Sequence, residues 1–472
     1  MTSLILPYSS TLTATEELPD IGTAASSTLT INQELHYGDA YMRMIRSSYP
    51  IINDPVLDEY ITTLGHRLVA NANDVKTPFT FFVIRDSNIN AFAFFGGYIA
   101  IHSGLLTHTQ SESELASVLA HEVAHVTQRH LARAMEEQAR TSPATLAALA
   151  GSLLLAVAAP PAGIAALATT QASIMQGQIN YTRSNEKEAD RFGLQTLSYA
   201  GFDPHAMPTF FGRLSEKYRY ASKPPPMLLT HPLPEDRLTD SRQRAQQFKS
   251  RPVQQSLNFH LARTRVIARY TGSKDENTHD WMLRQRKRAP AHIKEAFDYG
   301  IALTYLDNHE LKKAESALRP LYNSKPNNHF YLDAMTDLLI AQNKESEAIK
   351  LLDKALKVTP NNPVLQLNKA NVYIQANQYD NAFKILQRYT YEHPNDTNGW
   401  SLLSEASARL GNNAEEVAAR AEIHSLKAEW DKAIQYYSQA SQLAELGSLE
   451  QARYDARIDE LIIQRERFLA LQ

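Results

Sequence analysis

The sequence has 472 residues, too many for one compact core, so two to four domains are expected. Its 48 basic and 51 acidic residues are well mixed and leave a formal charge of −3, so nothing predicts an electrostatic partner such as a nucleic acid. The absence of cysteine excludes thiolate metal sites, cysteine nucleophiles and disulfides, and leaves any metal to His, Asp or Glu.

The first 30 residues are expected to lie outside the folded core. They begin "MTSLILPYSSTLTATEELPD", with a short apolar stretch and small residues around Thr13 and Ala14. The basic segment that opens a secretory signal is missing. Two interpretations remain open: a remnant of an export signal, or a disordered cytoplasmic tail.

Residues 33–72 show helical apolar spacing, and two strands are predicted after them. The strands are "FTFFVIRD" and "YIAIHSGLL", joined by the loop "SNINAFAFFGG", in which Gly96 and Gly97 suit a tight turn. The strand "YIAIHS" is a candidate for backbone pairing with an extended peptide. Its His102 is interpreted as a residue on the strand surface and not as a metal ligand.

The next segment, "SESELASVLAHEVAHVTQRHLARAMEEQ", is predicted to be one helix of about 25 residues with acidic residues near its start. His121 and His125 are four residues apart, so their imidazoles project from the same face and can share a metal. Glu122 lies beside them, within reach of a water on that metal. A catalytic zinc site takes three protein ligands and keeps one position open, so a third ligand must come from elsewhere.

Residues that follow within this helix do not supply the third ligand. His130 is nine residues past His121, about half a turn out of phase on a straight helix, so it is expected to face away as a surface or supporting residue. Gln128 and Leu131 stand where a "HExxHxxGxxH" arrangement needs Gly and His, which excludes that arrangement.

A better donor lies in "NEKEADRFG". Glu186 and Asp190 share one face of a helix, so one can bind zinc while the other accepts the free ring N–H of a ligand histidine. Glu188 is expected to point elsewhere. The alternative interpretation of this cluster is a solvated charged face.

Between these two segments, residues 141–182 contain no Asp, Glu, Lys or Arg. Each arm about Pro160 and Pro161 has only about 15 residues, or roughly 22 Å of helix, against roughly 30 Å of membrane hydrocarbon. A helical hairpin that is buried, or that touches a membrane surface through residues 144–175, is therefore favoured over two membrane-spanning helices. It is also a candidate shield for the cleft.

Past residue 251 the pattern becomes a helical array with a period of 34 residues. Pro326, Pro360 and Pro394 keep this step, and other columns repeat it: Ala314, Ala348 and Ala382, and Tyr305, Leu339 and Tyr373. Such a period, with small residues where paired helices touch, is typical of tetratricopeptide repeats. The array is expected to present a surface for segments of other proteins. The basic run "LRQRKR" is interpreted as a solvated helix face.

Several motifs together resemble a known family. "HEVAH" followed by "EKEAD", with "NAFAFFGGYIAIHSGLL" before and "THPLPEDR" after, resembles the HtpX and CAAX-prenyl-protease type of zinc metallopeptidase, a gluzincin family. With the repeats and "QARYDARIDEL", the chain resembles its periplasmic branch in Gram-negative bacteria from roughly "LPDIG" to the C-terminus. It departs in two places: Phe95 stands where many relatives have proline, and the basic start of a signal is absent.

The resemblance implies roles for individual residues. His121, His125 and Glu186 would bind one Zn²⁺ per chain, Glu122 would be the general base, and Asp190 would support a ligand. Bound zinc lowers the pKa of its water from about 15.7 to about 7, and Glu122 would take that water's proton and deliver it to the leaving amine.

The loop "THPLPEDR" supplies two further candidates. The developing oxyanion needs a second donor, and His231 and Arg237 are the candidates for it. His231 is also a candidate fourth zinc ligand that would silence the enzyme. The alternative for His231 is an exposed loop residue.

The sequence therefore predicts a mainly α protein: an N-terminal segment (1–30), an α+β zincin-type metallopeptidase domain with a small sheet (31–258), and a tetratricopeptide-repeat α-solenoid (259–472). The resemblance implies a zinc endopeptidase and chaperone in the periplasm. It would act in quality control and assembly of outer-membrane β-barrel proteins, including the lipopolysaccharide-assembly barrel, and dock on the β-barrel assembly machinery. The alternative is a repeat-based scaffold or chaperone whose protease is idle. A membrane-embedded prenyl-protein protease would need more spanning helices.

Overall fold

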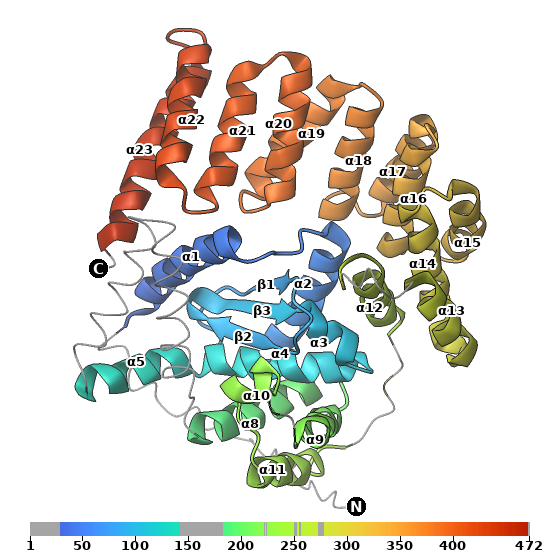
Figure 1. Cartoon of the computed structure of the whole chain (residues 1–472). Helices are drawn as coiled ribbons and strands as arrows, with labels where there is room; N and C mark the ends of the chain where they lie inside the picture. Colours follow the sequence, from blue (N-terminus) through green and yellow to red (C-terminus); the bar gives the residue numbers. More distant parts are fainter. Residues whose placement is uncertain are drawn as a thin grey trace, which may run out of the picture.

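The computed structural model describes residues 29–141, 183–220, 222, 224–249, 253, 256–271 and 278–470. Helices dominate these residues, and a small three-stranded sheet lies in the N-terminal half, which confirms the predicted fold class (Figure 1). The segment 144–175, which was predicted as an apolar hairpin, and nearly all of the N-terminal segment 1–30 lie outside the described residues. Among the helices that the structure describes, none combines the length and the apolar character needed to cross a membrane.

The sheet has the order β1-β3-β2, formed by β1 (Thr80–Ile84), β2 (Ala91–Phe94) and β3 (Tyr98–His102). β1 runs parallel to β3, and β2 runs antiparallel to it. β3 is thus the central strand, and its backbone groups are paired on both sides. The prediction that an extended peptide pairs with this strand is therefore wrong, because only an edge strand has free backbone groups.

β2 lies in the segment that the sequence predicted as a loop. Its four residues, "AFAF", are too few for a clear alternation of apolar and polar positions. The turn that follows, η1 (Phe95–Gly97), confirms the expected role of the glycine pair, since Gly96 and Gly97 have φ of 76° and 78°. A Cβ on Gly97 would lie 1.9 Å from the carbonyl oxygen of Pro78, so no larger residue fits.

Helices surround this sheet, and α4 packs against its β2 and β3 strands (Figure 1). The predicted helical region 33–72 forms two helices, because the chain crosses to the sheet between them and Ile51 pairs with Ile84. The helices of this half are α1 (Ile31–Ser48), α2 (Pro55–Val69), α3 (Ser103–His108), α4 (Glu112–Thr127), α5 (His130–Thr141), α8 (Arg183–Tyr199), α9 (Ala206–Tyr218), α10 (Pro226–Thr230) and α11 (Glu235–Ala245).

The C-terminal half is a helical array that arches over the N-terminal half (Figure 1). Its helices are α12 (Leu257–Arg269), α13 (Thr278–Arg288), α14 (Ala291–Asp307), α15 (Leu311–Ser324), α16 (His329–Ala341), α17 (Glu345–Val358), α18 (Pro363–Gln375), α19 (Tyr379–Glu392), α20 (Thr397–Leu410), α21 (Asn413–Ser425), α22 (Trp430–Leu443) and α23 (Leu449–Ala470).

The 34-residue period has a direct structural meaning. The three periodic prolines lie in the turns before α16, α18 and α20, and each of these helices is capped two residues later by Asn328, Asn362 or Asp396. Such side chains accept hydrogen bonds from the first free N–H groups of a helix. A second turn keeps the same period in the left-handed conformation, at His309, Asn343, Asn377 and Gly411. The period therefore marks both ends of the helix pairs.

The two halves meet around α2 and α12. α12 packs on α3 of the N-terminal half and on α14 of the array, while α16 and α18 contact α2. Arg265 of α12 lies at the centre of this junction: its Nε donates to Asp54 at 2.7 Å, and its Nη1 forms an ion pair with Asp333 of α16 at 2.7 Å. Since α12 contacts both halves, the boundary between residues 258 and 259 stays a prediction.

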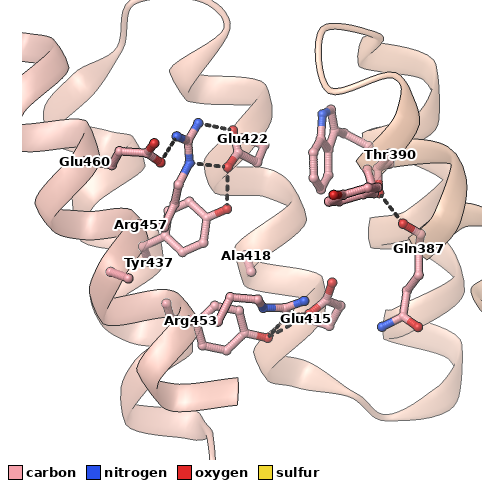
Figure 2. A pocket seen from close by; sticks show the side chains of 13 residues that line it. Gln387, Thr390, Glu415, Ala418, Glu422, Tyr437, Arg453, Arg457 and Glu460 are labelled. Atoms are coloured by element: carbon pink, nitrogen blue, oxygen red, sulfur yellow. Dashed lines mark hydrogen bonds and ion pairs between the residues drawn. The ribbon is translucent and has the colours of Figure 1, made fainter. Parts of the chain in front are cut away.

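At the far end of the array, a pocket of about 620 Å³ lies between α19, α20, α21, α22 and α23 (Figure 2). On one side, Arg453 and Arg457 of α23 pair with Glu415 and Glu422 of α21. Tyr391 of α19 lies on the other side and is 86% exposed. The pocket thus combines an exposed aromatic ring with charges that are already paired.

Candidate active site

α4 places two imidazoles and a carboxylate in the interior. Ser111 caps this helix, and nearly every residue along it is buried. His121 and His125 lie one turn apart, and their Nε2 atoms are 3.0 Å from each other. Glu122, between them in sequence, is completely buried. Interior polar groups of this kind need partners, because an unpaired buried polar group is costly.

α8 brings a third group to the same point. Glu186 Oε2 lies 3.5 Å from His121 Nε2, and Glu186 Oε1 lies 3.4 Å from His125 Nε2. The helices approach closely at Gly193, where a Cβ would lie 3.1 Å from the backbone nitrogen of His121. The carboxylate is 2% exposed, so it faces the histidine pair and not solvent.

The loop after α10 supplies a fourth group. His231 Nδ1 lies 3.4 Å from His121 Nε2 and 3.1 Å from Glu186 Oε1, and the side chain is buried. A hydrogen bond from the backbone N–H of Met227 to the carbonyl of Ile89 ties α10 to the segment before β2. The loop histidine is therefore held in the interior, and its interpretation as an exposed residue is wrong.

These four side chains fit a tetrahedral metal ion. One ligand atom from each of His121, His125, Glu186 and His231 lies within 4.8 Å of every other. Ligand atoms placed 2.0–2.1 Å from a tetrahedral zinc are roughly 3.4 Å apart. The separations of 3.0–3.5 Å between neighbouring atoms match that value.

The charge balance of the site also suits a divalent cation. Both oxygens of Glu122 are buried and accept no hydrogen bond from the described part of the chain. His231 Nε2 is 3.5 Å from one of them. Three carboxylates face a single guanidinium, so two formal negative charges are unmatched when the imidazoles are neutral; these groups are Glu122, Glu186, Asp190 and Arg237.

Asp190 and Arg237 support the site from outside. Asp190 Oδ1 lies 3.0 Å from His121 Nδ1, the ring nitrogen that points away from the other ligand atoms. Arg237 donates to both oxygens of Asp190, at 2.5 and 2.8 Å, and to the carbonyl of Pro232 at 2.9 Å, and it also pairs with Glu186. Arg237 is 2% exposed, and its guanidinium is engaged with the two carboxylates and this carbonyl.

The two histidines of α4 have opposite pKa shifts. Burial opposes the charged form of His121, but hydrogen bonds to Asp190 and Glu186 raise its pKa to about 9. Burial lowers the pKa of His125 well below its usual value. For Asp190, burial raises the pKa, but Arg237 outweighs it and lowers the value to about 2. The carboxylate beside His121 is therefore ionised.

Two residues lie where the sequence did not place them. The predicted long helix ends at Thr127 and restarts at His130, so His130 is fully buried against His125 and does not face away. A helix break of this kind leaves no signal in apolar spacing. His102 is also buried, at 6% exposure, with its Nδ1 3.4 Å from Asp86. It does not belong to the group of four side chains that could hold a metal.

Comparison with known proteins assigns the chain to a family. A model described as Peptidase family M48 matches residues 55–245, and a tetratricopeptide-repeat model matches residues 339–406. The "Putative beta-barrel assembly-enhancing protease" of Vibrio cholerae is 67% identical and covers 97% of this chain and 94% of its own. The "Beta-barrel assembly-enhancing protease" of Escherichia coli is 50% identical over 96% and 93%.

A more distant relative matches a smaller part of the chain. The "Mitochondrial metalloendopeptidase OMA1" of Schizosaccharomyces pombe is 30% identical over 43% of this chain and 54% of its own. The Vibrio and Escherichia proteases, by contrast, match nearly the whole chain, and the N-terminal half holds the four side chains that could bind a metal. The chain therefore belongs to peptidase family M48 and is a metallopeptidase that carries tetratricopeptide repeats.

Proposed function

We propose that the chain is a zinc-dependent endopeptidase and chaperone that acts on outer-membrane β-barrel proteins. The observation that carries the proposal is the convergence of two imidazoles from α4, one carboxylate from α8 and one imidazole from the loop after α10. Zinc is the metal that this donor set suits best, since imidazole and carboxylate ligands with tetrahedral spacing are typical of it.

In this proposal His121, His125 and Glu186 hold the metal, and Asp190 orients His121 by accepting its Nδ1–H. When bound, zinc polarises the scissile carbonyl and makes water nucleophilic at neutral pH. Glu122 takes the proton from the attacking water and returns it to the leaving amine, because its buried carboxylate has no competing donor among the described residues.

His231 has two roles in the proposal. In the position that the structure gives it, the imidazole lies among the other ligand atoms and completes a four-ligand set, which leaves no open position for water. The resting enzyme is thus silenced. When the loop moves, the same imidazole donates to the oxyanion. Arg237 is the other candidate for that donor; because it already donates to Asp190, Glu186 and Pro232, we propose that it braces the site instead.

The substrate class follows from the relatives and the repeats. The Vibrio and Escherichia relatives are named for enhancing β-barrel assembly, and the repeat array is an architecture that binds protein segments. We place the chain in the periplasm, with misassembled barrels, including the lipopolysaccharide-assembly barrel, as substrates and the β-barrel assembly machinery as docking partner. Residues 144–175, for which the sequence predicts an apolar hairpin, would touch the membrane surface. The pocket between α19 and α23 is the proposed contact for protein segments (Figure 2).

The decisive experiment compares Glu122→Gln with the wild type under conditions where both retain zinc. Cleavage of an unfolded barrel protein in vitro should fall about 10²–10⁴-fold, the usual contribution of a general base. Assembly of the barrel in cells should be retained if the chain is also a chaperone. Persistent cleavage would remove Glu122 from the mechanism. If neither zinc nor cleavage is found in the wild type, the alternative of a repeat-based scaffold with an idle protease holds.

A second variant tests the two roles of His231. His231→Ala removes the fourth ligand and the oxyanion donor together, so cleavage should change in one direction or the other. Release of the silenced state gives faster cleavage, while loss of the donor gives slower cleavage at saturating substrate. Unchanged cleavage in vitro and in cells would exclude both roles.

A further inference from the structure

The outer side of His125 has a partner that the sequence did not predict. His125 turns its Nε2 toward the other ligand atoms and its Nδ1 away from them, toward His130. The two Nδ1 atoms are 2.8 Å apart, which is the separation of a hydrogen bond. Both rings are buried. One of the two nitrogens must donate and the other must accept.

The far side of His130 decides which nitrogen donates. His130 Nε2 lies 3.1 Å from Glu188 Oε2, and Arg133 Nη1 lies 3.0 Å from the same oxygen. An ionised carboxylate only accepts hydrogen bonds, so the hydrogen of neutral His130 sits on Nε2. His130 Nδ1 is then an acceptor, and the hydrogen that it accepts belongs to His125 Nδ1. His125 Nε2 keeps its lone pair, directed at the candidate metal position.

The turn between α4 and α5 puts His130 in this place. Arg129 has φ of 51°, a conformation that is uncommon for a residue with a side chain. Its Nε donates to Glu34 Oε1 at 2.7 Å, and its Nη2 donates to the carbonyl of Leu29 at 2.6 Å. These buried contacts from the start of α1 hold the turn. α5 then restarts at His130, which brings its ring onto His125 instead of half a turn away.

We propose that His130 is a positioning residue that fixes the tautomer and the ring orientation of the metal ligand His125. Glu188 sets the tautomer of His130 in turn, so a chain of hydrogen bonds runs from the metal ligand to α8. The inference rests on the proposed metal site. With this assignment, each histidine of α4 has its own partner on the side away from the metal position. The partner of His121 is the carboxylate of Asp190, and the partner of His125 is the neutral imidazole of His130.

Two substitutions at His130 separate positioning from simple packing. In His130→Asn, Oδ1 takes the place of Nδ1 and can still accept from His125. In His130→Leu, the volume remains but the acceptor is lost. We expect zinc to bind about 10–100-fold more weakly to the leucine variant, the usual effect of removing such an outer partner, and within a few-fold of wild type to the asparagine variant.

The readout is zinc affinity, measured on the full chain by competition with a chelating dye, together with urea unfolding in EDTA. Equal zinc affinity in the leucine variant and the wild type would overturn the proposal. So would equal weakening in both variants, because packing alone would then explain the result. A wild-type chain that binds no zinc would contradict the proposed function itself and not this inference alone.

A second pair of variants covers the case in which His130 substitutions fail to fold. Glu188 has 30% side-chain exposure, so it tolerates change better. Glu188→Ala removes the acceptor for His130 Nε2, and we expect zinc affinity to fall several-fold with unfolding in EDTA little changed. Glu188→Gln keeps an acceptor oxygen and should bind zinc more tightly than the alanine variant. Zinc affinity in Glu188→Ala equal to that of the wild type would contradict the relay.

Discussion

Two buried clusters of charged side chains organise this protein, and they are built on opposite principles. At the candidate active site, three carboxylates lie near one guanidinium and beside the three imidazoles that could hold a metal, and both oxygens of Glu122 accept no hydrogen bond from the described residues. At the junction of the two halves, Arg265 lies between Asp54 and Asp333, and Tyr270 donates to Asp54 at 2.7 Å. In the first cluster Glu122 pairs with no Arg or Lys among the described residues, whereas in the second cluster both carboxylates pair directly with Arg265.

The difference teaches how to distinguish a binding site from a structural ion pair. A buried cluster in which each carboxylate pairs with a cation of the chain needs no further ion, and its role is to fix geometry. Asp54 illustrates this, because it also caps α2 by accepting from the backbone of Val56 and Leu57. A buried cluster with an unpaired carboxylate is stabilised when it binds a cation from solution. Both clusters are equally hidden, so burial alone does not separate them.

The largest effect on stability is expected at the junction. Arg265→Met leaves Asp54 and Asp333 buried without their shared cation, so the free energy of unfolding should fall by about 3–5 kcal/mol. All three tryptophans lie in the array, at residues 281, 400 and 430, so their fluorescence reports array unfolding in urea. Release of bound zinc reports the unfolding of the N-terminal half. The two transitions should separate in this variant, because the junction links the halves.

A matched control is Arg286→Met on α13. Arg286 pairs with Asp298, but its side chain is 43% exposed, so the change should have little effect on either transition. An equal loss of stability in both variants would contradict the special role of the junction cluster.

Removal of the metal is expected to give the next largest effect, and only at the active site. Free zinc at about 100 times its dissociation constant should raise the free energy of unfolding by about 2.7 kcal/mol relative to EDTA. Glu186→Gln should abolish most of this increment. Asp54→Asn should leave it unchanged, although it lowers stability in both conditions. If Asp54→Asn changed the gain in free energy of unfolding that zinc gives, the two clusters would not differ in the way described.

Features that depend on residues close together in the sequence could be predicted, whereas contacts between residues far apart in the sequence could not. The spacing of His121 and His125 on α4 and the 34-residue period are local patterns, and both correspond to regular structure. The position of His130 depends on Arg129, whose carboxylate partner Glu34 is 95 residues away. Arg265 likewise pairs with Asp54 across 211 residues. Apolar spacing carries no information on such contacts, since any surface charge would give the same pattern.

The features of the loop after α10 could be predicted only in part. The motif "THPLPEDR" singled out His231 and Arg237, but a proline-flanked loop predicts stiffness and not direction. The structure brings His231 to the ligand atoms and turns Arg237 to Asp190 and Glu186. The difference arises because α11 begins at Glu235, so Arg237 belongs to a helix that packs on α8.

A pH experiment tests the charge of the junction cluster. Burial raises the pKa of Asp54, but Arg265 outweighs it and lowers the value below 3.8. The unfolded chain therefore takes up this proton first as the pH falls. The stabilisation is complete above about pH 4 and is lost as the pH falls through the folded-state pKa. Asp54→Asn keeps the helix cap but not the charge, and should cost about 2 kcal/mol at pH 7.

The measurement is the difference in urea unfolding between wild type and Asp54→Asn at several pH values. This difference should be constant from pH 7 to about pH 5 and should shrink toward about pH 3. A difference that grows on acidification would mean that Asp54 is protonated in the folded chain.

The smallest effect on stability is expected for an Arg–Asp ion pair of α12 that lies at the protein surface. Arg269, one turn after Arg265 on α12, pairs with Asp307 at 2.9 Å, but the Asp307 side chain is 41% exposed. Water competes for both charges, so Asp307→Asn should change the free energy of unfolding by less than about 1 kcal/mol, and the change should shrink further in high salt. Urea unfolding at low and high salt measures both values. A loss as large as that of Asp54→Asn would show that burial does not set the strength of these pairs.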